Sequence, residues 1–398
     1  MGPVHWIVFS EVIPIYDFII SGAGPAGSFA AYNLSLRGFK VLQLEEHSSV
    51  GKPVECTGLV SRRVIEMSGT KSIVNRVHGA HIIFPDENSI HIRKDEESYV
   101  LERDRFDQDV SGLATGAGTE LKLKSTVLDI KVDERKVTVK YRENGNIREE
   151  TAIAIIGADG ANSITRKILF PGMRIQRMIS AYQIDGAKRM DDQDSVNVYL
   201  GSKFSRGFFG WAAPAEDLSR IGTAGFGLSR EKFMKINEGM GDPSKITITG
   251  GPIPISTLKR TYGNRVLLVG DAGGIVKPLS GGGIYTGMIS GQKAAEALIK
   301  GFEHNDFSRS FLKTYEDMWK NHIGKELRRD LKIQKMFAKI SDASFVELGR
   351  RLSNPKITHI INNLGDIDYP SRVVFNVLLR SPGILRHVLF PVRDKFGE

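Results

Sequence analysis

The sequence predicts an α/β fold, α+β overall, in which an inserted antiparallel sheet interrupts a parallel-sheet domain and a helical C-terminal region follows. Three observations lead to this prediction. A glycine-rich turn at residues 22–27 follows a buried type of strand and precedes a helix, and the same strand pattern returns at residues 266–269. Between them, residues 175–257 form short runs separated by glycine-bearing turns, which is typical of an antiparallel sheet. Residues 311–398 carry mostly helix-like patterns.

The return of the strand pattern makes the parallel-sheet domain discontinuous. We expect this domain to comprise residues 15–76, 101–174 and 258–310, and the inserted sheet to comprise residues 77–100 and 175–257. Periodicity and turn residues predict the following elements: a hairpin over 77–100 that turns at Pro85-Asp86-Glu87-Asn88, a helix near 105–117, strands at 126–132 and 136–141, a third strand after the turn at 144–146, a separate buried strand at 152–156, and a helix over 284–300.

The first turn, Gly22-Ala23-Gly24-Pro25-Ala26-Gly27, has the spacing Gly-x-Gly-x-x-Gly at a strand-to-helix junction. In this setting the first glycine permits the tight turn, the second lets a pyrophosphate approach the backbone, and the third lets helix and strand pack closely. The next buried run, residues 41–44, ends at Glu45, about 20 residues beyond the turn, where an acid that binds ribose belongs. The sequence therefore predicts a dinucleotide site. FAD and NAD both carry the free 2′-hydroxyl that suits Glu45.

Two further glycine turns also follow buried strands. Asp159-Gly160 lies in a turn that can aim a carboxylate and backbone amides at a cofactor, although an ordinary Asp-Gly turn has the same sequence. Gly270-Asp271 opens a loop that ends in Gly281-Gly282-Gly283, where the helix from Ile284 starts. Asp271 is placed to accept a hydrogen bond from a ribityl hydroxyl, and the glycines let the backbone approach a pyrophosphate at a helix N-terminus.

In this order, the three turns resemble those of the FAD-dependent hydroxylase superfamily, whose members have a Rossmann-like nucleotide fold of the glutathione-reductase type. Arg103, followed by Phe106-Asp107, is similar to that superfamily's arginine region near the cofactor. The resemblance covers roughly residues 15–305 and implies FAD as the tightly bound cofactor. The cofactor-binding residues that it implies are Gly22, Gly24, Ala26, Gly27, Glu45, Cys56, Arg103, Asp159, Gly160, Asp271, Gly282, Gly283 and Ile284.

The loop Pro53-Val54-Glu55-Cys56 points to one family within this superfamily, because it is similar to the Pro-x-x-Cys loop of the geranylgeranyl reductases. The resemblance implies that Cys56 lies near the flavin and makes it a candidate catalytic residue. Most unpaired cysteines are small buried hydrophobes, which is the competing interpretation of Cys56. Its glycine- and proline-flanked loop, between the cofactor strand and the substrate sheet, favours a position that lines the site.

A second segment, Gly207–Pro214, resembles the Tyr-x-Trp-x-Phe-Pro motif that lies beside the substrate in the same family. It makes Phe209, Trp211 and Pro214 candidate substrate-binding residues. This copy departs from the motif, since Phe209 replaces the tyrosine and Ala213 the phenylalanine, so a possible phenol donor is lost. Phe209 and Trp211 share one face of a strand. Core packing and a wall for an isoprenoid chain are both apolar environments, so composition does not separate them.

The resemblance implies an archaeal-type reductase that saturates C=C bonds of geranylgeranyl chains in digeranylgeranylglycerophospholipid, by hydride transfer from reduced flavin. An isolated alkene is a poor hydride acceptor, so catalysis should depend on positioning in a water-free tunnel. Two alternatives stay open: an FAD monooxygenase of a small aromatic or apolar substrate, and a non-catalytic flavin- and lipid-binding protein. NADPH, ferredoxin and a deazaflavin all fit as the electron donor.

Composition places limits on partners and location. The chain of 398 residues has one cysteine, which excludes an internal disulfide and is typical of a reducing cytoplasm. It has no uncharged apolar run of ~18 residues, so we expect no transmembrane helix. The net charge of +9 indicates an anionic partner, and the sequence shows no nucleic-acid-binding motif.

The basic charge is concentrated in residues 311–398, which hold 16 Lys and Arg against 10 Asp and Glu. Several helix-like stretches there mix basic with apolar side chains, as in Lys325–Lys339. An ordinary basic helical cap has the same composition as a surface that docks on anionic lipid and admits a lipid tail. We expect a cytoplasmic protein that associates peripherally with the membrane.

Overall fold

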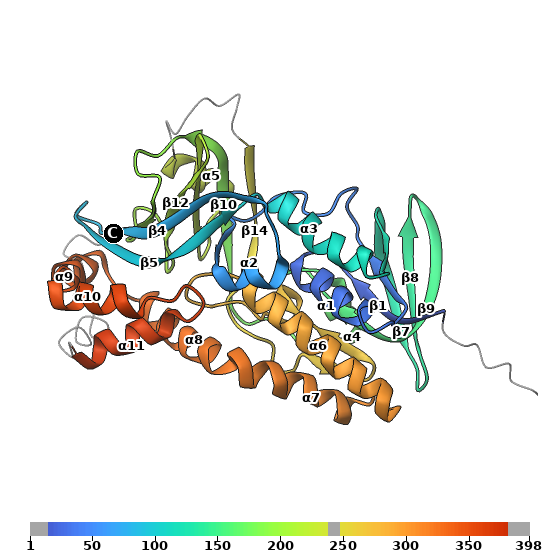
Figure 1. The fold of residues 1–398 in the computed structure, drawn as a ribbon. Helices are drawn as coiled ribbons and strands as arrows, with labels where there is room; N and C mark the ends of the chain where they lie inside the picture. The colour runs from blue at the N-terminus through green and yellow to red at the C-terminus, as the bar shows by residue number, and fades with distance from the viewer. Residues whose placement is uncertain (1–14, 238–246, 381–398) are drawn as a thin grey trace, which may run out of the picture.

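Two eight-stranded sheets form the framework of the computed structural model, which describes residues 15–237 and 247–380 (Figure 1). The first sheet has the order β15-β16-β9-β1-β2-β6, and β7 and β8 join it through the outer half of β9. Its strands are β1 (Tyr16–Ser21), β2 (Val41–Leu44), β6 (Glu120–Lys122), β7 (Ser125–Val132), β8 (Val137–Glu143), β9 (Asn146–Gly157), β15 (Tyr262–Gly263) and β16 (Val266–Leu268).

The centre of the first sheet is parallel and buried on both faces. Strands β16, β9, β1, β2 and β6 run parallel to one another. Phe18 and Ile20 of β1 point into one hydrophobic cluster, whereas Ile19 points into the cluster on the opposite face. Burial on both faces explains why these strands read as continuous apolar runs rather than as alternating patterns.

Strand β9 is one continuous strand where the sequence predicts two. Its first half pairs antiparallel with β8, and its second half pairs parallel with β1, with Ala152 paired to a residue of each. The exposed first half contains Arg148-Glu149-Glu150, and the buried second half is apolar. The change from one-sided to two-sided burial alters the residue pattern without ending the strand.

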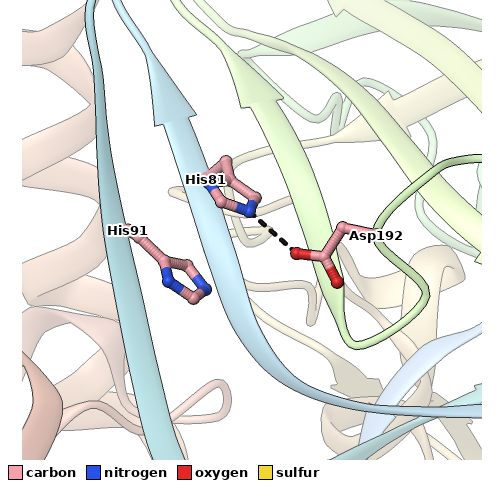
Figure 2. Close-up of side chains that lie close together, drawn as sticks. All are labelled: His81, His91 and Asp192. Carbon is pink, nitrogen blue, oxygen red and sulfur yellow. Dashed lines mark hydrogen bonds and ion pairs between the residues drawn. The ribbon is translucent and has the colours of Figure 1, made fainter.

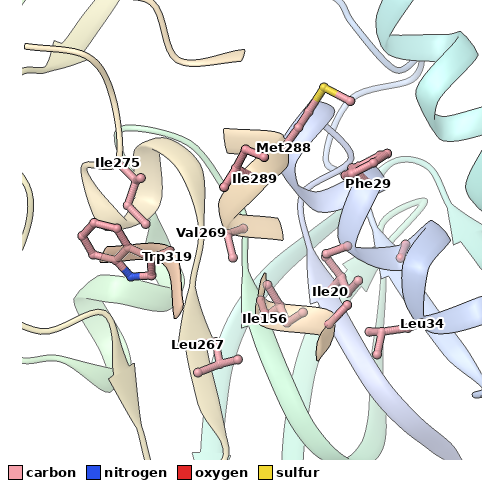
Figure 3. Packing of buried hydrophobic residues seen from close by; sticks show 14 of the residues in the cluster. Ile20, Phe29, Leu34, Ile156, Leu267, Val269, Ile275, Met288, Ile289 and Trp319 are labelled. Atoms are coloured by element: carbon pink, nitrogen blue, oxygen red, sulfur yellow. The ribbon is translucent and has the colours of Figure 1, made fainter. Parts of the chain in front are cut away.

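Helices cover the face of the parallel sheet that holds the main core (Figure 3). Side chains from β1, β9 and β16 pack there with Phe29 and Leu34 of α1, Met288 of α6 and Trp319 of α7. On the opposite face, β7 and β8 pack against Phe170, which follows α4. The helices of this domain are α1 (Pro25–Ser35), α2 (Arg62–Ser68), α3 (Arg103–Gly116), α4 (Ile164–Leu169), α6 (Ile284–His304) and α7 (Arg309–Trp319).

The second sheet has the order β14-β10-β13-β12-β11-β4-β5-β3, and all of its pairs are antiparallel except β11 with β4. Strands β4 and β11 can run parallel because a long stretch of chain, including α3 and β7–β9, connects them. The elements of this sheet are β3 (Leu59–Ser61), β4 (Ile73–Ile83), β5 (Ser89–Leu101), β10 (Met178–Lys188), β11 (Ser195–Tyr199), β12 (Gly210–Ala215), β13 (Leu218–Gly225), β14 (Thr247–Pro254) and, packed against it, α5 (Arg230–Ile236).

The C-terminal region is helical over its described part, as the sequence predicts. A π-helical segment, Lys320–Gly324, continues α7 into α8, and the remaining helices follow in order. These are α8 (Lys325–Phe337), α9 (Asp342–Leu352), α10 (Pro355–Leu364) and α11 (Pro370–Arg380). Residues 381–398 of the predicted helical region lie outside the described residues. No helix in the described part of the chain combines the length and the apolar character needed to cross a bilayer.

Helices α1 and α6 lie so close together that a single added methyl group should disturb their contact. A Cβ at Gly291 of α6 would lie 2.3 Å from the carbonyl oxygen of Ala26 in α1. We expect Gly291→Ala to lower the free energy of unfolding by about 1–3 kcal/mol, the usual cost of overpacking. Denaturant unfolding of the purified protein measures this change.

Gly112→Ala is the matched control. Gly112 also lies inside a helix, α3, but no described atom lies within 4 Å of its notional Cβ. Alanine should stabilise α3 by about 0.5–1 kcal/mol, because it lowers the entropy of the unfolded chain. Equal stability of the wild type and Gly291→Ala would show that the two helices do not meet as closely as the structure describes.

Candidate functional site

The first glycine turn joins β1 to α1 at the carboxyl end of the parallel sheet. Gly22 has φ +103°, and a Cβ there would lie 2.4 Å from the carbonyl oxygen of Ala158. A Cβ at Gly27 would lie 2.3 Å from the carbonyl oxygen of Gly22. Gly24 differs, because no described atom lies within 4 Å of its notional Cβ. The first and third glycines therefore serve packing, and the second faces open space at the helix N-terminus, where a phosphate fits.

Glu45 follows β2 directly and reaches back to the glycine turn. Its Oε2 accepts a hydrogen bond of 2.8 Å from the Ala23 N–H, and its Oε1 accepts one of 2.9 Å from the His47 N–H. His47 Nδ1 lies 2.7 Å from the same Oε1. The carboxylate is 8% exposed and fixed beside the turn. A carboxylate accepts further hydrogen bonds through its remaining lone pairs, so Glu45 fits a ribose hydroxyl.

Asp159 fixes the second turn. Its Oδ1 accepts a hydrogen bond of 2.5 Å from Ser163 Oγ, and its Oδ2 accepts one of 2.8 Å from the Thr165 N–H at the start of α4. Gly160 has φ +68° and faces open space among the described residues. The carboxylate is thus engaged within its own turn, and its predicted contact with a cofactor stays a prediction.

Arg166 links this turn to the third one, and the sequence reasoning did not place it among the site residues. Its Nη1 donates to the Ala272 carbonyl at 2.9 Å, and its Nη2 donates to the Ala161 carbonyl at 2.6 Å. The guanidinium is buried, which lowers its pKa. The arginine at the start of α4 was the available signal, but the sequence does not reveal that its partner lies about a hundred residues away.

Asp271 and Arg103 lie where the third turn meets α3. Arg103 makes a bidentate pair with Asp107, with both N–O distances 3.0 Å. Burial lowers the pKa of Arg103, but Asp107 and the Cys56 sulfur outweigh it, so the pKa is raised overall. Burial raises the pKa of Asp271 to about 6, although Arg103 and Arg166 oppose this shift. Asp271 is half-buried.

The glycines that precede α6 lie between Asp271 and the second sheet, which we call the substrate sheet because the sequence predicts that it contacts the substrate. A Cβ at Gly283 would lie 3.0 Å from Asp271 Oδ1, and one at Gly282 would lie 2.9 Å from Lys277 Cε. Gly281 has φ +72° and approaches Phe208, whose Cζ is 3.5 Å from the notional Cβ. Ile284 is the half-buried first residue of α6. This glycine loop brings backbone, rather than side chains, to the junction of the two sheets.

The Cys56 loop also spans this junction. The half-buried Cys56 sulfur accepts a 3.4 Å hydrogen bond from the Gly58 N–H and contacts Arg103. On the other side, Thr57 Oγ1 donates to Gln183 Oε1 of β10 at 2.8 Å. Trp211 Nε1 donates to the same oxygen at 3.3 Å. Cys56 therefore lies between the arginine region of the cofactor domain and the aromatic segment of the substrate sheet.

Gln183 and Phe208 are two residues of this site that the sequence reasoning did not single out. Gln183 is 4% exposed, and its Nε2 has no hydrogen-bond partner among the described residues. An unpaired buried donor costs about 1–3 kcal/mol, so it suits an acceptor on a bound molecule. Phe208 stacks on Phe209 with ring centroids 4.4 Å apart. Gln183 belongs to no motif, and Phe208 lies in the segment Gly207–Pro214 but just before its first motif position, Phe209, so the sequence offered no signal for either role.

The aromatic segment brings two of its three candidate residues together. The rings of Phe209 and Trp211 meet edge to face at 6.3 Å and 71°. The Trp211 indole lies flat over Gly222 of β13, where a Cβ would come within 2.1 Å of the ring. Pro214 is buried on β12 but lies three residues from Trp211, so the two side chains point to opposite faces. The structure does not bring Pro214 to the wall formed by Phe209 and Trp211.

Together these residues fit an elongated dinucleotide such as FAD. The open space at Gly24 and the unpaired N-terminus of α1 suit a pyrophosphate, and Glu45 suits a ribose. Asp271 lies near the N-terminus of α6, toward the Cys56 loop and the substrate sheet. The residue types match the two ends of the cofactor that the sequence predicts.

Comparisons with known proteins agree with this geometry. Residues 16–221 match the protein family described as FAD binding domain. The chain is 30% identical over 370 residues to a digeranylgeranylglycerophospholipid reductase of Thermoplasma acidophilum, with 87% of this chain and 93% of that protein covered. The structure of this chain is similar to that of a geranylgeranyl bacteriochlorophyll reductase-like protein of Thermoplasma acidophilum, with a TM-score of 0.81 and 26% identity. The match covers 93% of this chain and 99% of that protein. A p-nitrophenol 4-monooxygenase of Pseudomonas putida, 16% identical with a TM-score of 0.69, shares the fold.

Glu45→Gln tests the ribose position. The substitution keeps the size of the side chain but removes its charge, and a hydrogen bond to a charged group is worth about 1.5–3 kcal/mol. We therefore expect the Kd for FAD to rise about tenfold or more, as measured by fluorescence titration of the apoprotein. Glu46→Gln, at the exposed neighbouring residue, is the control and should bind FAD as the wild type does. Equal affinities of both variants would contradict the assigned position.

Proposed function

The chain belongs to the geranylgeranyl reductase family of FAD-binding flavoproteins, and on that premise we propose that it saturates C=C bonds in the geranylgeranyl chains of digeranylgeranylglycerophospholipid. One observation supports this function above the others. The Cys56 loop contacts Arg103 of the cofactor domain on one side and, through Thr57 and Gln183, the Trp211 wall on the other. The residues that hold the reactive end of FAD thus adjoin an aromatic surface that suits a hydrocarbon chain.

The chain's own residues contribute placement and exclusion of water. Reduced FAD supplies the hydride when bound. The partly buried Phe209 and Trp211 offer aromatic surface on which an isoprenoid chain can lie, and the buried Phe208 supports Phe209 by stacking on it. No hydroxyl at position 209 disturbs this surface. An unactivated alkene has no carbonyl whose developing charge the protein could stabilise. Correct placement next to the flavin therefore supplies most of the rate. We assign Cys56 to the wall of the reaction space, because it lies between the two groups of residues.

We also propose that the substrate is taken from an anionic membrane surface. A cavity of about 430 Å³ opens between α8, α10, α11 and β5, and basic side chains of Lys94, Arg329 and Arg372 line it. Phe375 of α11 also lines the cavity and is 61% exposed, and Leu379 of the same helix is 65% exposed. Basic residues next to exposed apolar ones suit phosphate headgroups at a lipid surface.

An anaerobic half-reaction tests the proposed function. The FAD of the purified protein is reduced with dithionite, the excess is removed, and digeranylgeranylglycerophospholipid is added. We expect reoxidation of the flavin, followed by absorbance, together with a lipid product that gains two hydrogens per reduced double bond by mass spectrometry. Reoxidation by oxygen but not by the lipid would overturn the reductase and favour a monooxygenase.

Trp211→Ala tests the aromatic wall in the same assay. Loss of the indole removes the surface that positions the lipid, so lipid-dependent reoxidation should slow about tenfold or more while FAD remains bound. Phe302→Ala removes an aromatic ring that is 46% exposed on α6 and should leave the rate unchanged. If Trp211→Ala loses its FAD or keeps the wild-type rate, the indole is not part of the substrate wall.

Charge reversal tests the membrane surface. The double variant Arg329→Glu and Arg372→Glu should bind vesicles containing phosphatidylglycerol about thirtyfold less or weaker still, since each basic residue near such a surface contributes about 1 kcal/mol and the new carboxylates are repelled. The control carries Arg105→Glu and Arg142→Glu, which make the same change of charge at exposed positions of α3 and β8. Vesicle sedimentation measures both, and equal losses would show that only net charge matters.

A further inference from the structure

Three potential metal ligands meet on the substrate sheet, away from the residues assigned to FAD (Figure 2). His81 of β4 and His91 of β5 are directly opposite each other in the antiparallel register. Their rings stack with centroids 4.3 Å apart and planes 11° from parallel. Asp192, in the loop before β11, places its Oδ2 2.9 Å from His81 Nε2. Two strands and a loop from distant parts of the sequence therefore supply the cluster.

The spacing of these ligands is close to that of a zinc site. One ligand atom of each side chain lies within 4.8 Å of those of the other two. Bonds of about 2.0–2.2 Å in tetrahedral geometry place ligand atoms about 3.4 Å apart, so small side-chain rotations close the difference. Parallel rings do not aim their nitrogens at one ion, and binding must therefore tilt them. His91 is exposed and His81 half-buried, which leaves room for that rotation and for a water as fourth ligand.

Neighbouring groups hold two of the three side chains, Asp192 and His91, in place. The Asp194 N–H donates to Asp192 Oδ1 at 2.8 Å, so one carboxylate oxygen is fixed while the other faces His81. His91 Nε2 lies 3.0 Å from Ser195 Oγ. This approach requires Gly79, because a Cβ there would lie 2.8 Å from His91 Nε2 and 2.9 Å from Ser195 Oγ. Such supporting contacts orient metal ligands in protein sites.

The local charges also suit a divalent cation. The cluster contains one carboxylate, that of Asp192, and one of its oxygens faces His81. Arg93 does not oppose a cation strongly, because Asp194 pairs with it and with His78.

We propose that His81, His91 and Asp192 bind one zinc ion, with water as the fourth ligand, and that this ion ties β4 and β5 to the loop before β11. Two imidazoles and one carboxylate favour zinc over magnesium or calcium, which prefer oxygen ligands. Strand β11 pairs with β12, the strand that carries Trp211. The ion thus steadies the sheet behind the aromatic wall, whatever substrate the wall accepts.

Zinc titration of the FAD-loaded full chain, after treatment with a chelator, tests the proposal. Isothermal titration calorimetry should show one zinc per chain. His81→Gln, His91→Gln and Asp192→Asn should each weaken binding about tenfold or more. Zinc should also raise the melting temperature of the wild type, because it binds the folded state, but not that of Asp192→Asn. Flavin absorbance confirms that each variant keeps its fold.

His359→Gln is the matched control, since it replaces an exposed histidine on α10 outside the cluster. It should bind zinc as tightly as the wild type does. Two results would overturn the proposal: the absence of saturable zinc binding by the wild type at micromolar concentrations, or binding that all three ligand variants retain. Either result would leave the cluster as a set of hydrogen bonds between strands.

Discussion

The close contact between α1 and α6 is the constraint on which the cofactor site depends. Ala26 of α1 fills the space against three glycines, since a Cβ at Gly270, Gly287 or Gly291 would lie 2.3–3.3 Å from an atom of Ala26. Only backbone at these positions lets the two helices meet. Their N-termini, and the glycine turns that precede them, therefore lie at the same edge of the parallel sheet, where such folds bind nucleotides. Without this contact the two halves of the FAD site, far apart in the sequence, do not converge.

Buried basic side chains, through hydrogen bonds and an ion pair, join the other parts of the chain to this centre. Arg220 of β13 is 3% exposed and donates to the carbonyls of Thr57 and Leu101 at 3.0 and 2.6 Å, which ties the substrate sheet to the Cys56 loop. Lys277, in the glycine loop, pairs with Asp368 at 3.0 Å and so anchors the C-terminal helices. Buried pairs are weak evidence for stability because desolvation offsets their attraction. Their directional contacts nevertheless set how the insertion and the C-terminal region meet the cofactor residues.

The cofactor half of the site could be predicted from the sequence, and much of the substrate half could not. Glu45 and the glycine turns are readable because each performs its role within a short strand-turn-helix unit. Gln183 carries no such signal, since its partners come from the Cys56 loop and from β12. Phe208 stands next to a motif position, but the sequence does not show that its ring is buried against Phe209. The separate strand predicted at 152–156 failed for a related reason: β9 changes its burial without ending. The zinc ligands were equally hidden, because Asp192 lies far along the chain from the hairpin that holds the two histidines.

Positions fixed by close backbone contacts keep the family's motif residues, whereas positions held by side-chain packing can depart from them. A side chain at Gly22 or Gly27 would collide with backbone at less than 2.5 Å, so these positions admit only glycine. Phe209 is held instead by stacking on Phe208 and by an edge contact with Trp211, and neither contact needs a phenol hydroxyl. Replacement of tyrosine by phenylalanine there changes the polarity of the wall without disturbing its packing. An entirely apolar ring at this position suits a hydrocarbon chain better than a small polar aromatic substrate.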